Sequence, residues 1–276
     1  MKIIGENINE HPVKELGNII YYTNSAGDLM PVVATNNNGR QDYIRLTSTK
    51  RLGAKTSARS TPNPQNKTGL QLWVKKNTNI TNTTGRFTTW GDISTNANDL
   101  TGDGASPYVM LSSDYYALMD GVSAKFTLGT ALSLSQFTIS FVIKDQRGKL
   151  GVLTGKSSDA NAFISTSYAS GGSVTLSLAS GEVYSTAAGV VPHNEDVLVT
   201  VIKDSSNTLF VRVNATQVYT TTAASTALQI DQIGKLGSST DTFMGNIYEI
   251  CIYNTALTGD DLSTVELGLK ARNRIA

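Results

Sequence analysis

The stretch FMGNIYEICIYNTALTGDDLSTVELGLKARN, residues 243–273, decides the fold. Its first part is a largely apolar run of strand length, which predicts a β-strand. A short polar turn follows, and Thr258 then stands at a position suited to begin a helix. Asp261 lies three residues later, so the pair predicts a capping box at the start of that helix. The chain is therefore expected to end in a strand, a turn and one capped helix.

Segments of strand length precede this ending over most of the chain, and Gly, Asn, Asp or Ser turns separate most of them. Regular spacing, alternation and almost no helical periodicity predict an antiparallel sandwich of two sheets. The expected core positions are the inward residues of three strands: Phe137, Ile139, Phe141, Ile143, Leu198, Thr200, Ile202, Leu209, Val211 and Val213.

Composition excludes several classes of function. The chain has 276 residues, 16% of them charged, and a net charge of +1, so it has no global field that would attract nucleic acid or an anionic membrane. Its apolar runs are only of strand length, too short to insert in a bilayer, and we expect no secretory signal peptide. The single Cys251 excludes an internal disulfide and is expected to be a buried hydrophobe rather than a reactive thiol.

Residues 1–68 are expected to form an extended N-terminal arm, with a helical turn starting at Pro12, a few short strands and a basic linker. Between Arg40 and Arg59 of this arm, six positive side chains face a single negative one, Asp42. They are Arg40, Arg45, Lys50, Arg51, Lys55 and Arg59. Two interpretations stay open: a solvated linker, or an anchor that orders on an acidic partner surface. Nucleic acid is less favoured, because Tyr43 is the only aromatic residue between Arg40 and Arg59.

Two motifs carry a resemblance to a known superfamily. One is the C-terminal stretch, through Gly245, Ile247, Glu249, Ile250, Ile252, Tyr253, Ala256, Leu257 and Thr258. The other joins GLQLWVKK (69–76) to FTTWGDISTNANDLTG (87–102). Together they resemble the concanavalin A-like lectin/glucanase superfamily, in its laminin G-like form. The resemblance implies an all-β, antiparallel two-sheet jelly-roll sandwich over residues 69–276. That fold carries lectins, adhesins, glycosidases and inert spacers, so the ligand stays open.

The arm and the Asn- and Thr-rich composition are similar to those of structural proteins of tailed bacteriophages. This similarity implies a virion protein assembled in the bacterial host cytoplasm, as a capsid decoration, a fibre or a tail-associated protein. Its partners would be other virion proteins, reached through the arm, and a host-surface glycan, and it could form a trimer. The alternative is a soluble carbohydrate-binding module or lectin of a cell, and a glycoside hydrolase is third.

Catalysis is not expected. A glycosidase needs two carboxylates that flank the bond, and on a strand these must share a face. Ile247 and Cys251, two residues from Glu249 on either side, are expected to share its face of the strand, and neither is a carboxylate. Glu195 and Asp196 are adjacent and so point to opposite faces. If Glu249 is buried it must be paired. We expect it to tie the last strand to the region of Trp90, with ligand contact as the alternative.

Three groups of residues are candidates for sites. Oxygen donors that would suit calcium, or that merely build turns, are Asp92, Asn96, Asn98 and Asp99. Aromatic residues near turns, able to contact a sugar or to pack, are Tyr115, Tyr116, Tyr168 and Tyr184. Residues given a structural role are Trp73, Trp90 and Glu249. Zinc is excluded, because no cluster of His and Cys occurs.

Overall fold

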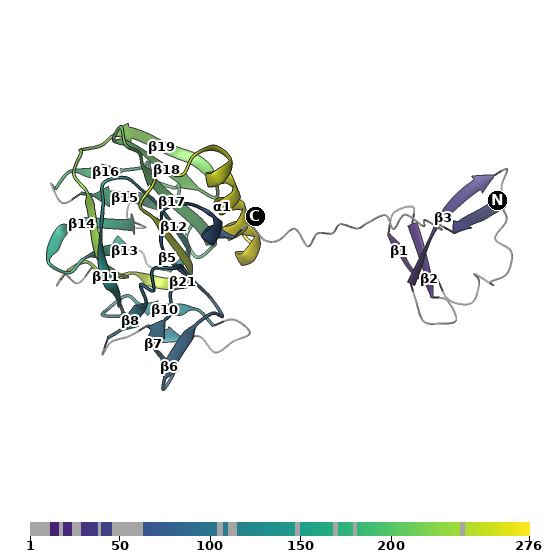
Figure 1. The fold of residues 1–276 in the computed structure, drawn as a ribbon, viewed down its shortest axis with the longest axis horizontal. Helices are drawn as coiled ribbons and strands as arrows, with labels where there is room; N and C mark the ends of the chain where they lie inside the picture. Colours follow the sequence, from purple (N-terminus) through teal and green to yellow (C-terminus); the bar gives the residue numbers. More distant parts are fainter. Residues whose placement is uncertain are drawn as a thin grey trace. The chain divides into compact units, whose positions relative to one another are not determined.

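The structure is a computed structural model. It describes residues 63–103, 107–109, 115–146, 150–167, 171–178, 181–237 and 241–276, together with the backbone of four strands between residues 12 and 45. The chain divides into two compact units, residues 1–59 and 60–276 (Figure 1). Each unit is described by itself. No helix of the described residues is long and apolar enough to cross a membrane.

The first unit contains a four-stranded antiparallel sheet in which each strand pairs with the next. Its strands are β1 (Pro12–Leu16), β2 (Ile19–Thr23), β3 (Leu29–Asn37) and β4 (Arg40–Arg45). The helical turn expected at Pro12 is wrong, because Pro12 begins β1. Proline lacks an N–H group and is tolerated at the first position of a strand, so its presence does not require a helix.

The second unit is an antiparallel sandwich, which confirms the expected fold class. In its first sheet β12 lies between β17 and β21, and β21 pairs with both β5 and β10 on its other side. The strands of this sheet are β5 (Leu70–Lys75), β10 (Ala117–Asp120), β12 (Phe137–Asp145), β17 (Asp196–Lys203), β18 (Thr208–Val213), β19 (Thr216–Thr222) and β21 (Met244–Tyr253).

The second sheet runs in the order β8, β11, β20, β13, β14, β15, β16. Its strands are β8 (Leu100–Gly102), β11 (Phe126–Leu134), β13 (Leu150–Lys156), β14 (Asp159–Ser167), β15 (Ser173–Ser177), β16 (Val183–Ser185) and β20 (Leu228–Ile233). Three short strands join the sheets at one end of the sandwich: β6 (Ile80–Thr83), β7 (Arg86–Trp90) and β9 (Tyr108–Val109).

The main core lies between the two sheets. Phe137, Ile139, Phe141 and Ile143 of β12 belong to it, as the alternation predicts. On β17 the prediction is wrong: Val197, Val199 and Val201 face this core, whereas Leu198 faces the other side of the sheet. Both faces of this strand are buried, and each face of the stretch VLVTVI (197–202) is mainly apolar. The sequence therefore cannot reveal which face points inward.

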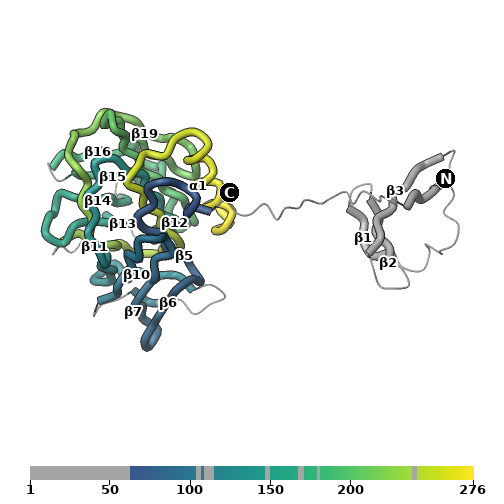
Figure 2. Tube along the Cα trace, viewed as in Figure 1, coloured from purple at the N-terminus to yellow at the C-terminus, as the bar shows by residue number. Residues whose placement is uncertain are grey.

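A second apolar layer covers the outer face of the first sheet. Helix α1 (Gly259–Asn273) packs Val265 and Leu269 against side chains of four strands, and the short 3₁₀-helix η2 (Pro64–Asn66) lies close to β5. The strand residues in this layer are Trp73, Val142, Leu198, Cys251 and Tyr253. The start and the end of the second unit therefore meet in space: in Figure 2, β5 lies beside the yellow C-terminal segment.

The start of α1 is where the sequence predicts it, but the capping box is absent. Thr258 has an extended backbone and forms no side-chain capping hydrogen bond. The carboxylate of Asp261 instead lies 2.5 Å from the Nζ of Lys67, in the segment before β5. A long-range ion pair has therefore replaced the local bond, which a sequence motif cannot anticipate.

Candidate functional site

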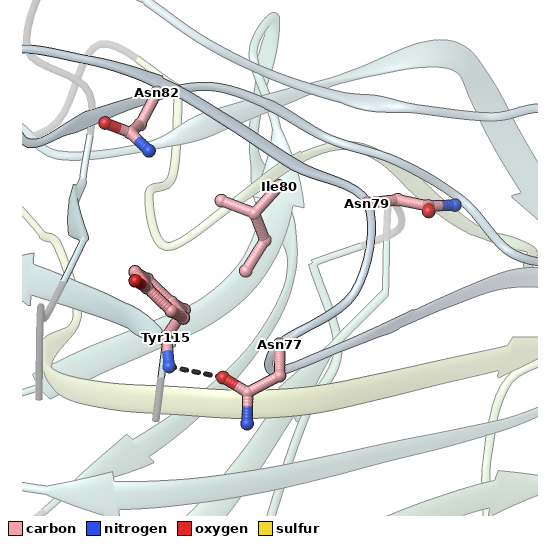
Figure 3. A pocket seen from close by; sticks show the side chains of 5 residues that line it. All are labelled: Asn77, Asn79, Ile80, Asn82 and Tyr115. Atoms are coloured by element: carbon pink, nitrogen blue, oxygen red, sulfur yellow. Dashed lines mark hydrogen bonds between the residues drawn. The ribbon is translucent and has the colours of Figure 1, made fainter. Parts of the chain in front are cut away.

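An open hollow lies at the end of the sandwich where β5 turns into β6 (Figure 3). It has a volume of about 420 Å³. The residues that line it are Asn77, Asn79, Ile80, Asn82 and Tyr115. Four of them come from one short segment, residues 77–82. Tyr115 comes from the residues just before β10, which the pairing of β5 and β10 with β21 brings close.

Backbone geometry fixes the floor of this hollow. Asn77 and Asn79 have φ angles of 61° and 50°, in the left-handed region that asparagine tolerates better than most residues. The backbone N–H of Asn77 donates to the carbonyl of Tyr115 at 2.9 Å. In return the Tyr115 N–H donates to the side-chain oxygen of Asn77 at 2.5 Å. These two hydrogen bonds hold the Tyr115 backbone while its ring stays 44% exposed.

The exposed groups in the hollow suit a polyhydroxylated ligand. The side chains of Asn79 and Asn82 are exposed, and each amide offers N–H donors and an oxygen acceptor. The Tyr115 ring provides an apolar surface with a hydroxyl at its tip. Figure 3 shows Ile80 between Asn79 and Asn82, above the Tyr115 ring. An aromatic surface flanked by amides can contact the apolar face of a sugar ring and its hydroxyl groups together.

The other three tyrosines named from the sequence do not join Tyr115 in this hollow. The Tyr116 ring packs edge-on against Tyr248, with the ring centroids 4.9 Å apart. The Tyr184 hydroxyl accepts a hydrogen bond from the backbone N–H of Ala224 at 2.9 Å, and its ring packs against the core. These contacts are the packing role that the sequence left open. Tyr168 lies outside the described residues.

The carboxylate of Asp92 organises the loop that the sequence marks as a calcium candidate. Its Oδ1 accepts from the backbone N–H groups of Trp73 and Ser94 at 2.9 and 2.8 Å. Its Oδ2 accepts from the Ser94 hydroxyl at 2.6 Å and the Asn98 N–H at 2.9 Å. Both oxygens are therefore already directed at donors of the protein, and they tie this loop to β5.

The remaining members of that loop also bond to backbone groups. Asp99 accepts from the Asp92 N–H at 2.8 Å, and the Asn98 amide forms hydrogen bonds in both directions with the backbone of Thr130. The Asn96 amide donates to the carbonyl of Leu70 at 2.6 Å. Within the part of the chain that the structure describes, no group of three or more His, Cys, Asp or Glu side chains could hold a metal ion.

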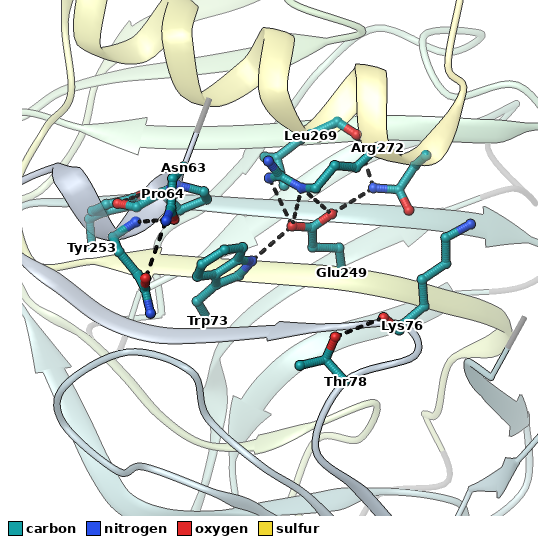
Figure 4. A network of polar contacts seen from close by, with 11 residues as sticks. Asn63, Pro64, Trp73, Lys76, Thr78, Glu249, Tyr253, Leu269 and Arg272 are labelled. Carbon is teal, nitrogen blue, oxygen red and sulfur yellow. Dashed lines mark hydrogen bonds and ion pairs between the residues drawn. The ribbon is translucent and has the colours of Figure 1, made fainter. Parts of the chain in front are cut away.

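Glu249 lies at the centre of a polar network between the first sheet and α1 (Figure 4). Its side chain is only 1% exposed. Its Oε1 accepts from the indole N–H of Trp73 at 2.8 Å and lies 2.9 Å from an Nη of Arg272. Its Oε2 accepts from the Asn273 amide at 2.7 Å. The expected partner region is wrong: Glu249 is tied to Trp73 and the helix, whereas the Trp90 indole donates to the carbonyl of Lys75.

A β-bulge explains how Glu249 reaches the helix. Opposite β12, Val142 pairs with Glu249 but the next residue, Ile143, pairs with Ile247, so Tyr248 is an extra residue. The bulge shifts the alternation: Ile247 faces the main core, whereas Cys251 faces the layer under α1. The expectation that Ile247, Glu249 and Cys251 share a face is therefore wrong, because strict alternation assumes an unbroken strand.

The buried carboxylates of the described chain are all engaged in structural bonds. Besides Asp92 and Glu249, Glu266 forms a two-pronged ion pair with Arg212, and Asp145 accepts from the hydroxyl of Thr166. Cys251 is a free, fully buried cysteine. Burial, and to a smaller extent the nearby Glu249 carboxylate, raise the pKa of its thiol, which keeps it in the unreactive protonated form.

The basic residues predicted to anchor the arm are described only in part. Arg40 and Arg45 are the two ends of β4. Lys50, Arg51, Lys55 and Arg59 lie outside the described residues, so the anchoring role stays a prediction.

Sequence reasoning missed the asparagines of the hollow. The segment NTNITN, residues 77–82, places three asparagines within six residues beside a turn, and that repetition was the available signal. What the sequence cannot show is that Tyr115 lies next to this segment in space. It also gives no sign that Arg272 and Asn273, at the end of α1, lie close to β5 around Glu249.

Solved structures of other proteins share this fold. Domain 4 of AbnA, an extracellular arabinanase from Geobacillus stearothermophilus, solved with arabinotriose, superposes with a TM-score of 0.54 at 17% identity, over 72% of this chain and 98% of that one. The ligand-binding domain of botulinum neurotoxin serotype D, solved with N-acetylneuraminic acid, gives a TM-score of 0.52 at 14% identity, over 77% of this chain and 53% of that one.

The binding domain of Paraclostridial Mosquitocidal Protein 1 is a third example, with a TM-score of 0.51 at 12% identity, over 76% of this chain and 54% of that one. This chain thus spans about half the length of the two toxin domains. No protein-family model and no curated protein matches the sequence. At these identities the likeness shows a shared β-sandwich fold.

Proposed function

We propose that this protein is a non-catalytic, lectin-like glycan-binding protein and that the Tyr115 hollow is its binding site. The observation that carries the proposal is an exposed aromatic ring, held in place through its backbone and flanked by exposed asparagines in an open hollow. The solved domains named above include one bound to arabinotriose and one bound to N-acetylneuraminic acid, which adds support from the fold.

The absence of catalysis is part of this proposal. Hydrolysis of a glycosidic bond needs an acid and a second carboxylate on either side of the bond. The buried carboxylates of the described chain bond to Arg, Trp, Asn, Ser or Thr side chains or to backbone N–H groups inside the fold. Among the described residues, those that line the Tyr115 hollow include no carboxylate. This described lining is therefore suited to binding and does not include the pair of carboxylates that cleavage requires.

We place the protein in a virion, displayed on the capsid, a fibre or the tail, where the first unit would attach it. Support comes from the division of the chain into two compact units and from the basic residues of the segment before the sandwich. A soluble carbohydrate-binding module of a cell has the same site and differs in the role of residues 1–59. Incorporation into particles distinguishes them, because loss of residues 1–59 abolishes incorporation only for a virion protein.

Calcium binding at the loop of Asp92 stays a prediction. Because the Asp92 oxygens accept four hydrogen bonds from the protein, a bound ion would have to compete with them. Melting temperatures measured with calcium and with a chelator test it directly. Equal temperatures would argue against a site.

The glycan site is tested by isothermal titration of the full chain with the oligosaccharides that it binds on an array. Changing Tyr115→Ala removes the aromatic surface, and we expect an affinity at least about tenfold weaker, which corresponds to about 1.4 kcal/mol. Tyr108→Ala is the matched control. Its ring is 41% exposed but packs under the guanidinium of Arg86, outside the lining of the hollow. If both variants bind like the original protein, the hollow is not the site.

A further inference from the structure

A second pocket lies on the outer face of the first sheet, beside the start of α1. Its volume is about 220 Å³, which is below the roughly 300–1,000 Å³ of sites that hold drug-sized molecules. We call it the Phe210 pocket, after the aromatic side chain in its lining. Among the described residues, none lines both this pocket and the Tyr115 hollow. The pocket is thus a separate site, of a size that suits one small ring.

Strand alternation supplies the apolar floor of the Phe210 pocket. Leu209 and Val211 of β18 face the main core, so Phe210 between them faces outward. Its side chain stays half-buried instead of being covered by α1. The other large apolar residues in the lining are Ile202, Leu257 and Leu262. An aromatic ring with aliphatic side chains around it can accept the apolar face of a ligand.

The guanidinium of Arg212 is fixed at the side of this pocket by a buried partner. Its Nε donates to Oε1 of Glu266 at 2.9 Å, and its Nη2 donates to Oε2 of Glu266 at 3.0 Å and to the carbonyl of Ala215. The Glu266 side chain is 1% exposed, whereas that of Arg212 is 21% exposed. Its Nη1 donates to no residue of the described chain. Arg212 thus offers a ligand one donor whose position is already set.

Three further polar groups of the lining are available to a ligand. Oδ1 of Asp204 accepts from the backbone N–H groups of Ser206 and Thr208 at 2.9 and 2.7 Å, which orients the carboxylate. Its Oδ2 accepts no hydrogen bond from the residues that the structure describes. The amide of Gln217 is exposed, and the exposed Thr258 hydroxyl does not cap α1. The pocket therefore combines an apolar floor with donors and acceptors at its rim.

We infer that the Phe210 pocket is a second sugar-binding site, which takes one neutral sugar unit with its apolar face on the Phe210 ring. The sugar hydroxyls would donate to Asp204 and form hydrogen bonds with Arg212, Gln217 and Thr258. This site goes beyond the proposed function and does not depend on the Tyr115 hollow.

Charge and polarity select this ligand class. Asp204 would repel an anion, and Arg212 would repel a cation, so a neutral ligand fits best. A plain hydrocarbon would cover the polar rim without pairing it, which costs free energy. The hydroxyls of a sugar both donate and accept hydrogen bonds, as this mixed rim requires.

NMR titration of the isotope-labelled full chain tests the site with three neutral probes: the methyl glycosides of glucose, galactose and N-acetylglucosamine. Because a single sugar unit is a small ligand, we expect dissociation constants in the millimolar range, visible in solution but too weak for an array. At least one probe should shift the amide signals of Phe210, Gln217 and Thr258 in a saturable way. Phe210→Ala should weaken that binding about tenfold and Gln217→Ala about threefold.

Two residues of β14, in the second sheet, provide matched controls. Phe163 is half-buried like Phe210, and Asn161 is exposed like Gln217, but neither lines the pocket. Phe163→Ala and Asn161→Ala should leave the titration unchanged, and thermal melts confirm that all four variants fold. Equal weakening by the variants and their controls would overturn the site, because the effect would then not arise at the pocket.

The outcomes separate this site from the Tyr115 hollow. Shifts at the Phe210 pocket that persist in Tyr115→Ala and weaken in Phe210→Ala support the second site. Shifts confined to Tyr115 and to residues 77–82 overturn the second site and leave the first intact. No saturable shift at the Phe210 pocket with any of the three probes also overturns the second site, whatever the array shows for the first.

Discussion

Glu249 shows how one residue can hold two layers of this protein together. It accepts hydrogen bonds from Trp73 of β5 and from Arg272 and Asn273 of α1, all in a buried setting. Changing Glu249→Gln removes the buried charge and its ion pair with Arg272. We expect the free energy of unfolding to fall by about 3 kcal/mol, measured by urea denaturation. Glu195→Gln, at an exposed position, is the control. A loss as small as that of the control would contradict the structural role.

Asp120 gives a prediction for pH at the same scale. Burial alone would raise the pKa of its carboxyl, but hydrogen bonds from the N–H groups of Ala124, Val122 and Ser123 outweigh that effect and lower it below 3.8. A lowered pKa means that the stabilisation is complete above pH 3.8 and disappears as the pH falls through the folded value.

The change Asp120→Asn should therefore cost about 1 kcal/mol of unfolding free energy at neutral pH. This difference from the original protein should shrink to nothing in strong acid. Urea denaturation across a pH series measures it. A difference that stays constant down to the lowest pH would show that the charge of Asp120 plays no part.

At the scale of elements, the loop of residues 91–99 depends on one side chain. Asp92 accepts four hydrogen bonds that connect this loop to itself and to β5. Changing Asp92→Ala leaves buried N–H groups of Trp73 and Asn98 without a partner. We expect a loss of about 2 kcal/mol in unfolding free energy. Hydrogen exchange should quicken at Trp73, Ser94 and Asn98, whereas the amides of β14 should keep their rates. Unchanged exchange in the loop would contradict this account.

Elements differ in how far their sequence predicts them. β12 was predictable because its inward Phe and Ile residues alternate with Thr138 and Ser140. β17 was not, because α1 covers its second face and both sets of residues are apolar. The position of Glu249 could not be predicted either, since a single extra residue at Tyr248 changes which face it occupies. Of the proposed binding site, Tyr115 was predictable as an exposed aromatic near a turn. Its asparagine neighbours required the fold.

At the scale of the whole molecule, the two units should be separable. Residues 60–276 contain their own core and the second layer under α1. We expect a chain of residues 60–276 alone to melt within a few degrees of the sandwich transition in the full chain and to bind glycan with the same affinity. Calorimetry and titration measure these two properties. A large fall in melting temperature would show that residues 1–59 are part of the folding unit.

The central claim is that the sandwich binds glycan at Tyr115. The most direct measurement is a glycan array probed with the full chain and with its Tyr115→Ala variant, in calcium and in chelator. The account predicts selective binding that the variant loses in both conditions. Binding that the variant retains in full, or no binding by the original protein in either condition, would contradict it.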